Sequence, residues 1–213
     1  MTTQGQVEHR VLDTAERLFG EHGFASVRLR QIADELSIKP ASLYYYAPGG
    51  KQDLYCKVVE RSMERHEQGM RQAVAKAGPE LEARLNAIAE WVLSQPRMNL
   101  SRMMDSDMSE LTNEAADRLR GRMYRAMFLP IIAVFEEARQ RGEIEGPASP
   151  SLTGALIAMV QGVQFVREEQ LGRSHMELVA ELVTVLKRGL RPEPDVHQAR
   201  EHHSPGSASN DPA

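Results

Sequence analysis

The sequence predicts an all-α protein with a small helical head followed by a larger helical body, and three observations support this. Apolar residues recur at the three- and four-residue spacing of amphipathic helices along most of the chain. No segment alternates polar and apolar residues over the length of a strand. Turn-forming clusters such as Pro48-Gly49-Gly50 and Gly78-Pro79 separate the helical segments.

The head is expected to contain three short helices. The first has an apolar stripe from Val7 to Phe19 and ends at Gly23. The second covers 29–36, where Ser37-Ile38 interrupts its pattern. Pro40 suits the first turn of the third helix, because a proline there removes no helical hydrogen bond. Two short helices joined by a tight turn make a helix-turn-helix candidate, placed at about 28–47.

Six longer helices are expected in the rest of the chain, at 51–77, 80–94, 97–109, 112–141, 150–171 and 174–190. Pro130 should kink the fourth of these, because it lacks a backbone N–H donor. Residues 191–213 are rich in proline and poor in apolar residues, which is typical of a disordered tail. The predicted division is a head at 5–66, a body at 67–190 and a tail at 191–213.

Composition excludes fibrous and wholly disordered proteins, since 41% of the 213 residues are hydrophobic and 26% are charged. Cys56 is the single cysteine, so no intramolecular disulfide can form, and a buried thiol is favoured over a redox sensor. The amino terminus lacks the apolar stretch of a secretory signal. The run 152–166 is too short and too polar to span a membrane. We therefore expect a cytoplasmic protein that does not bind membranes.

Charge and tyrosines distinguish the head from the rest of the chain. The whole chain has a net charge of −4. Residues 26–51 carry four basic and two acidic side chains, a net charge of +2. Tyr44, Tyr45 and Tyr46 are consecutive, and successive helical residues point about 100° apart. We expect Tyr44 to pack inward and the other two to face solvent or a partner. Tyrosine hydroxyls can bond phosphate oxygens, so the cluster favours nucleic acid over an ordinary solvated face.

The region from Arg10 to Leu54 resembles the DNA-binding domain of TetR-family transcriptional regulators. The residues that carry the resemblance are Ala15, Leu18-Phe19, Gly23-Phe24, Ile32-Ala33, Leu36, Ser42-Leu43-Tyr44-Tyr45, Lys51 and Leu54. The chain departs from the family pattern at four places. Ser37 replaces a usual turn glycine, Lys39 a usual serine or threonine, and Ala47 a common phenylalanine, and Pro48-Gly49-Gly50 adds one residue before Lys51.

The resemblance implies that the head binds double-stranded DNA at a palindromic operator. It also implies a homodimer, a small-molecule effector of apolar character bound in the body, and a repressor released by that effector. The predicted DNA-binding residues are Arg28, Arg30, Gln31, Lys39, Ala41, Ser42, Tyr44, Tyr45, Tyr46 and Lys51.

The body is expected to hold the effector pocket and the dimer interface. Six methionines lie between 98 and 127, which suits either an adaptable cavity or ordinary core filling. The predicted pocket residues are Trp91, Met104, Met127, Phe128 and Phe165. Wide apolar faces on the last two helices suit a four-helix interface between subunits, with burial inside one chain as the alternative. The predicted interface residues are Leu152, Leu156, Met159, Val163, Leu178, Leu182 and Leu186.

Other classes of function fit the sequence less well. No nucleophile motif of the G-x-S-x-G kind occurs. Gly50-Lys51 lacks the glycine that a phosphate loop has five residues earlier, and Gln52 follows it. His66-Glu67 has no second histidine at the zinc-protease spacing. We therefore expect no enzyme activity, no metal site and no cofactor. A helical protein-interaction adaptor and a transcriptional activator of the same fold remain as alternatives.

Arg30 offers a test of base recognition. We expect Arg30→Ala to relax the preference for one base position of the operator, because an arginine can bind guanine through two hydrogen bonds. Binding measured across a panel of single-base operator variants checks this. An affinity loss that is uniform over the panel would mean that Arg30 contacts phosphate only.

Overall fold

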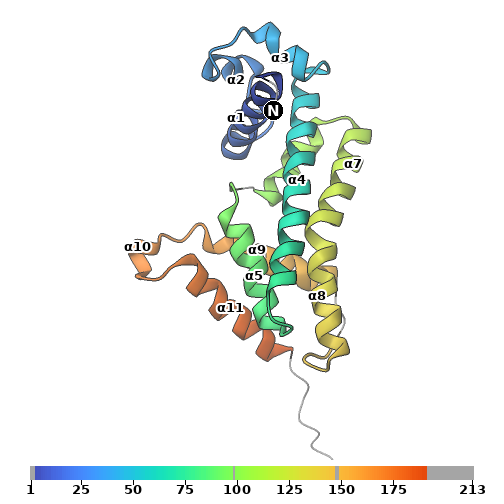
Figure 1. Ribbon diagram of the computed structural model, residues 1–213, viewed down its shortest axis with the longest axis vertical. Helices are drawn as coiled ribbons and strands as arrows, with labels where there is room; N and C mark the ends of the chain where they lie inside the picture. The colour runs from blue at the N-terminus through green and yellow to red at the C-terminus, as the bar shows by residue number, and fades with distance from the viewer. Residues whose placement is uncertain (1–2, 98, 147–148, 191–213) are drawn as a thin grey trace, which may run out of the picture.

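The computed structural model describes residues 3–97, 99–146 and 149–190, and every regular element in these ranges is a helix (Figure 1). The predicted all-α fold is thus confirmed. The predicted tail at 191–213 lies outside the described residues. The head consists of α1 (Thr3–His22), α2 (Leu29–Glu35) and α3 (Pro40–Tyr46). These three helices lie at one end of the 27-residue helix α4 (Gly50–Lys76).

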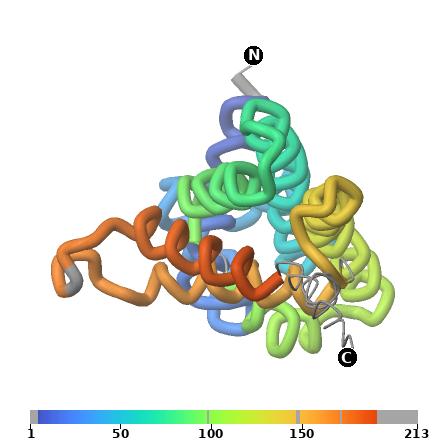
Figure 2. Tube along the Cα trace, turned by 90° about the horizontal axis from the view of Figure 1, so that it is seen from below, coloured from blue at the N-terminus to red at the C-terminus, as the bar shows by residue number. Residues whose placement is uncertain are grey.

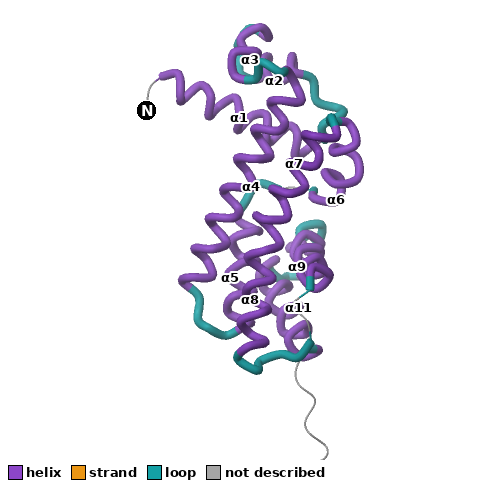
Figure 3. Tube along the Cα trace, turned by 90° about the vertical axis from the view of Figure 1, so that its right-hand side faces the viewer, coloured by secondary structure: helices purple, strands orange, loops and turns teal. Residues whose placement is uncertain are grey.

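The body surrounds the rest of α4. Its elements are α5 (Leu81–Ser94), α6 (Leu100–Arg102), the π-helical turn η1 (Met103–Asp107), the 3-10 turn η2 (Met108–Glu110), α7 (Asn113–Met123), the π-helical turn η3 (Tyr124–Phe128), α8 (Leu129–Gln140), α9 (Pro150–Val163), α10 (Glu168–Leu171) and α11 (His175–Gly189). Figure 3 shows α4 running from the head into the body. Seen from below, the α10 end of the α9–α11 hairpin projects away from the other helices (Figure 2). None of the described helices is long and apolar enough to cross a bilayer.

Three of the predicted helices are interrupted. The segment predicted at 97–109 is three short turns, α6, η1 and η2. The helix predicted at 150–171 ends at Val163, and α10 follows after a short turn. This break lets the chain reverse, so that α11 packs back against α5 and α9.

The interruption predicted at Pro130 takes the form of a wide turn. In η3 the backbone N–H of Leu129 bonds to the carbonyl of Tyr124, five residues earlier. Pro130 then stands in the first turn of α8, where no N–H donor is required. The π-helical turn therefore accommodates the proline, and α7, η3 and α8 continue along one side of α4 (Figure 1).

Helix α4 forms the centre of the core. Leu54, Met63 and Met70 are fully buried along it. His66 is also buried, and burial lowers the pKa of its imidazole to about 4, so the ring is neutral at physiological pH. Gly69 allows a close approach by α5. A Cβ atom there would lie 2.0 Å from the ring of Trp91.

The close contact between Gly69 and Trp91 predicts opposite effects for two glycine substitutions. Gly69→Ala should lower the free energy of unfolding by about 1–3 kcal/mol, because the indole must move out of a packed site. Gly162→Ala in α9 is the matched control, since nothing lies within 4 Å of the added Cβ. It should raise stability by up to about 1 kcal/mol. Urea titrations followed by circular dichroism measure both, and equal effects would contradict the packing.

Candidate nucleic-acid interface and cavity

The turn between α2 and α3 has the geometry of a helix-turn-helix. Ser37 has a φ of 57°, in the left-handed region that glycine adopts more easily. The backbone N–H of Ile38 donates to the carbonyl of Ala33, which closes the turn. Serine therefore makes the turn that the sequence comparison expected of glycine. Lys39 follows as the N-cap of α3, and its side chain makes no capping bond.

Helix α3 buries one face and exposes another. Leu43 and Ala47 are buried, and Tyr46 is half-buried beside them. Tyr44 is 54% exposed and Tyr45 is 67% exposed. The prediction that Tyr44 packs inward is therefore wrong. Positions one helical turn apart share a face, so Leu43 is joined by residues 46 and 47, and position 44 turns outward.

The carboxyl end of α3 is held by α4. The ammonium of Lys57 donates to the carbonyl of Tyr46 over 2.5 Å and lies 3.6 Å from the carboxylate of Asp53. The rings of Tyr45 and Tyr46 meet edge to face with centroids 5.2 Å apart. Tyr46 thus supports the ring of Tyr45, whose surface is the more exposed of the two.

The predicted polar contacts of the head lie at the surface. Arg30 is exposed and 3.7 Å from Asp34. The side-chain oxygen of Gln31 accepts the backbone N–H of Arg28 over 2.6 Å, so Gln31 also caps α2. The exposed residues of this predicted set are Arg28, Arg30, Gln31, Lys39, Ala41, Ser42, Tyr44 and Tyr45.

Lys51 is turned toward the head itself. Its ammonium donates to the carbonyl of Ala25 over 3.1 Å and lies 4.3 Å from the ring centroid of Phe24. Burial lowers the pKa of this ammonium. Lys51 therefore fastens the turn after α1 to α4, and its contact with phosphate stays a prediction.

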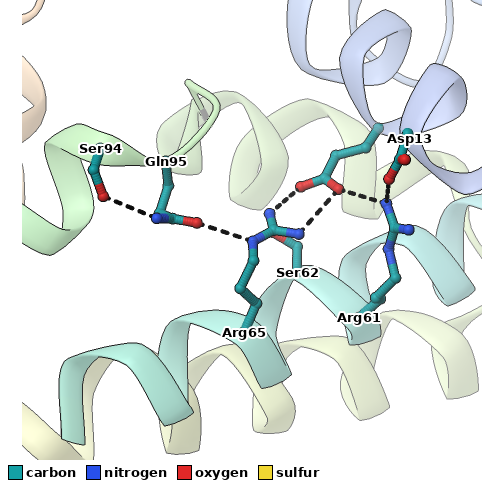
Figure 4. A network of polar contacts seen from close by, with 7 residues as sticks. Asp13, Arg61, Ser62, Arg65, Ser94 and Gln95 are labelled. Atoms are coloured by element: carbon teal, nitrogen blue, oxygen red, sulfur yellow. Dashed lines mark hydrogen bonds and ion pairs between the residues drawn. The ribbon is translucent and has the colours of Figure 1, made fainter. Parts of the chain in front are cut away.

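An ion-pair network joins α1 to α4 (Figure 4). The carboxylate of Glu16 accepts hydrogen bonds from Arg61 over 2.9 Å and from both terminal nitrogens of Arg65. Arg61 also pairs with Asp13 over 2.7 Å, and Arg65 donates to Gln95 over 3.0 Å. Burial alone would raise the pKa of Glu16, but the two arginines outweigh it and lower the pKa. Glu16 is thus held as a carboxylate between head and body.

A second carboxylate, which belongs to the body, also connects it to the head. Asp107 in η1 is buried, and its two oxygens accept the backbone N–H of Phe24 over 2.9 Å and the hydroxyl of Tyr55 over 3.1 Å. Phe19, Phe24 and Tyr55 form an aromatic cluster, with centroid distances between 5.0 and 6.1 Å. Burial, followed by the charge of Asp107, raises the pKa of Tyr55. The phenol therefore stays protonated and donates.

A cavity of about 1440 Å³ lies between head and body. Its wall combines α1, residues 96–97, 99–102 and 104–105, the α7–η3 segment and the α9 side of the body. Four of the five predicted pocket residues line it: Met104, Met127, Phe128 and Phe165. Trp91 does not, because its ring packs against Gly69, and that prediction is wrong. Phe165 is 82% exposed at this wall.

The predicted interface helices show a mixed pattern of burial. Leu156 is 2% exposed and Val163 is also buried, so both face the core of their own chain. Helices α5, α9 and α11 pack on one another and account for this burial. The other predicted residues are half-buried in the single chain: Leu152, Met159, Leu178, Leu182 and Leu186.

Several residues of the site escaped the sequence analysis. Glu16, Arg102 and Asp107 connect segments that lie 45 to 83 residues apart. No local spacing signals such contacts. The contribution of α1 to the cavity wall was missed for the same reason. Among the described residues no group of three or more histidine, cysteine or acidic side chains could hold a metal ion.

Comparison with known families decides between the alternatives for the head. Residues 11–57 match the family model described as bacterial regulatory proteins of the tetR family. The match runs from the buried face of α1, through the turn at Ser37, into α4. The helix-turn-helix region of this chain, residues 11–57, is thus of the TetR type.

Individual proteins show how far the likeness extends along the chain. The uncharacterized HTH-type transcriptional regulator YxaF of Bacillus subtilis is 37% identical over 59 residues, which are 28% of this chain and 31% of that protein. The chain thus aligns with about a third of the length of this relative. A TetR transcriptional regulator from Legionella pneumophila has a TM-score of 0.67 at 19% identity, covering 90% of this chain and 98% of its own.

A further solved structure shares the fold. It is that of AibR in complex with isovaleryl coenzyme A and operator DNA, with a TM-score of 0.66 and 19% identity. The alignment covers 84% of this chain and 96% of AibR. Likeness at this identity shows a common fold of head and body together.

The three consecutive tyrosines give a prediction that separates contact from support. Tyr45→Ala should weaken binding to an operator roughly 5- to 150-fold, the equivalent of about 1–3 kcal/mol, and lower the melting temperature less than Tyr46→Ala does, because Tyr45 is the more exposed ring. Tyr46→Ala should lower both the DNA affinity and the melting temperature, since its half-buried ring packs against the hydrophobic core and supports Tyr45. Fluorescence anisotropy with labelled DNA and thermal unfolding measure the two effects. Unchanged DNA affinity in Tyr45→Ala would refute the assigned contact.

Proposed function

We propose that this chain is a transcriptional regulator that binds a palindromic operator as a homodimer and leaves it when an effector fills the body cavity. The observation that carries the proposal is the exposed face of α3. It presents the rings of Tyr44 and Tyr45 beside basic residues of α2 and of the α3 amino end, on a TetR-family helix-turn-helix. A positively charged surface with exposed hydroxyls suits phosphates and base edges.

The dimer is proposed from the half-buried apolar residues of α9 and α11. Leu178, Leu182 and Leu186 recur at four-residue spacing on α11, and Val185 beside them is 61% exposed. Pairing such a face with a second copy would cover it. Two recognition helices would then address two half-sites about 34–36 Å apart, or a multiple of that distance.

The effector is proposed to be a large and mostly apolar molecule. The cavity exceeds the roughly 300–1000 Å³ that is usual for small ligands. Methionine and phenylalanine side chains on its wall favour an apolar partner. AibR, which shares the fold, binds isovaleryl coenzyme A. This supports an acyl compound as one candidate for the present cavity.

Repression is the proposed direction of control, because an occupied operator blocks access to a promoter. Activation by the same fold is the second candidate. A reporter gene placed behind the selected operator separates them, because deletion of the regulator raises expression under repression and lowers it under activation.

Selection from random double-stranded DNA tests the DNA-binding part. We expect a palindromic site, with log affinity falling against log salt at a slope of about −5 if two heads together neutralise six phosphates. Arg28→Gln should make this slope shallower by one to two units. Arg139→Gln on α8 is the control, since it lies on the body and pairs with Glu136. A shallow slope and no preferred sequence would favour the protein-interaction adaptor.

A further inference from the structure

Arg102 belongs to both the cavity and the head. Its side chain lines the large cavity. One terminal nitrogen donates to the carbonyls of Phe19 over 2.9 Å and Gly20 over 2.5 Å. The other donates to the carbonyl of Glu21 over 3.4 Å. These carbonyls end α1, where a helix lacks internal donors and carries partial negative charge. Arg102 therefore closes the carboxyl end of α1.

The turn that follows Arg102 continues the same contact. Met104 and Asp105 line the cavity, and two residues later Asp107 accepts the backbone N–H of Phe24 and the hydroxyl of Tyr55. The segment 100–107 thus presents one set of side chains to the cavity and another to the head. Both sets of side chains share this short stretch of backbone.

The cavity wall has two chemically different ends. The segment from α7 to α9 is mostly apolar, with Met123, Met127, Phe128 and Ile157. The end near α1 is polar, and its carboxylates are largely engaged: Glu16 binds Arg61 and Arg65, and Glu21 binds Arg17.

Donors remain at the polar end. Arg97 makes no side-chain hydrogen bond or ion pair within the described residues, and the Nε of Arg102 has no hydrogen-bond acceptor there. That Nε lies 3.9 Å from the carboxylate of Asp107. Asp105 is the wall carboxylate without an arginine partner in the described ranges. A guanidinium only donates, so it selects a ligand that brings an accepting oxygen.

We propose that a ligand acts on the head directly through Arg102: an apolar chain fills the α7–α9 end, and an accepting oxygen at the other end competes with the α1 carbonyls for the guanidinium. This inference rests on the proposed function. In this proposal the effect of ligand binding reaches the head through the carboxyl end of α1 and not through a movement of α4. Loss of the Arg102 bonds leaves the last carbonyls of α1 without these donors and loosens the turn at Gly23-Phe24.

Two measurements without ligand test the contact between Arg102 and the carboxyl end of α1. Arg102→Met should speed hydrogen exchange of the Gly23 and Phe24 amides and weaken operator binding roughly tenfold, within the range of typical coupling. Arg102→Lys should restore part of both, since an ammonium can still donate to the carbonyls. Arg120→Met is the matched control: it removes another arginine of the wall, whose partner is Asp117 on its own helix. Equal results for Arg102→Met and Arg120→Met would overturn the proposal.

Three probes that share a ten-carbon chain and differ in their polar group test the ligand chemistry: decanoate, methyl decanoate and decyltrimethylammonium. Decanoate should release the wild-type chain from the operator and should act at least roughly tenfold more weakly on Arg102→Met. Methyl decanoate has an accepting carbonyl but no charge, so comparing it with decanoate shows whether the ligand needs a negative charge or only an accepting oxygen. Release by decyltrimethylammonium alone, or by none of the probes, would overturn the assigned ligand class.

Failure of the proposed function is distinguishable from failure of this inference. If no DNA sequence is selected, the regulatory function fails. Hydrogen exchange at Gly23 in Arg102→Met still reports on the contact between Arg102 and the end of α1. If operator binding is normal and this exchange is unchanged, only the role of Arg102 fails. Exchange in α11, which Arg102 does not touch, should stay constant in every variant and shows that the body remains folded.

Discussion

The buried carboxylate of Asp107 is the contact on which the relation of head and body depends. It accepts one bond from the backbone of the α1–α2 turn and one from Tyr55 on α4. Because a buried carboxylate without partners would be very costly, these donors must stay together for the fold to hold. Removing either donor leaves this buried carboxylate with one hydrogen bond and the Arg102 guanidinium 3.9 Å away, so the position of the head is narrowly defined at this point.

The second contact between head and body, the Glu16 network, is only partly buried. Glu16 and its two arginines are partly open to solvent, and such pairs contribute less than fully buried ones because water and salt screen them. The head is thus held firmly at the turn beside Phe24 and more loosely along the middle of α1.

Much of the fold could be predicted from the sequence, because each helix carries its own apolar stripe and its own stop. The helix-turn-helix was found from local spacing, although Ser37 stands where glycine is usual. The wall position of Met127 was found, whereas that of α1 was not. Tyr44 was misplaced because its neighbour Leu43 suggested an inward face, and only the packing of Ala47 shows which side is buried. Contacts between distant segments have no signature in local periodicity.

The contact of Trp91 with Gly69 also makes this tryptophan an intrinsic fluorescence probe of the α4–α5 contact. Trp91 is the single tryptophan, and its indole nitrogen has no hydrogen-bond partner in the described part of the chain. Its emission therefore comes from one place, the crossing of α4 and α5. Any sliding of α4 would alter the polarity around this ring. Intrinsic fluorescence can thus follow the movement of α4 in the unlabelled protein, and a motion confined to the end of α1 would leave the emission spectrum unchanged.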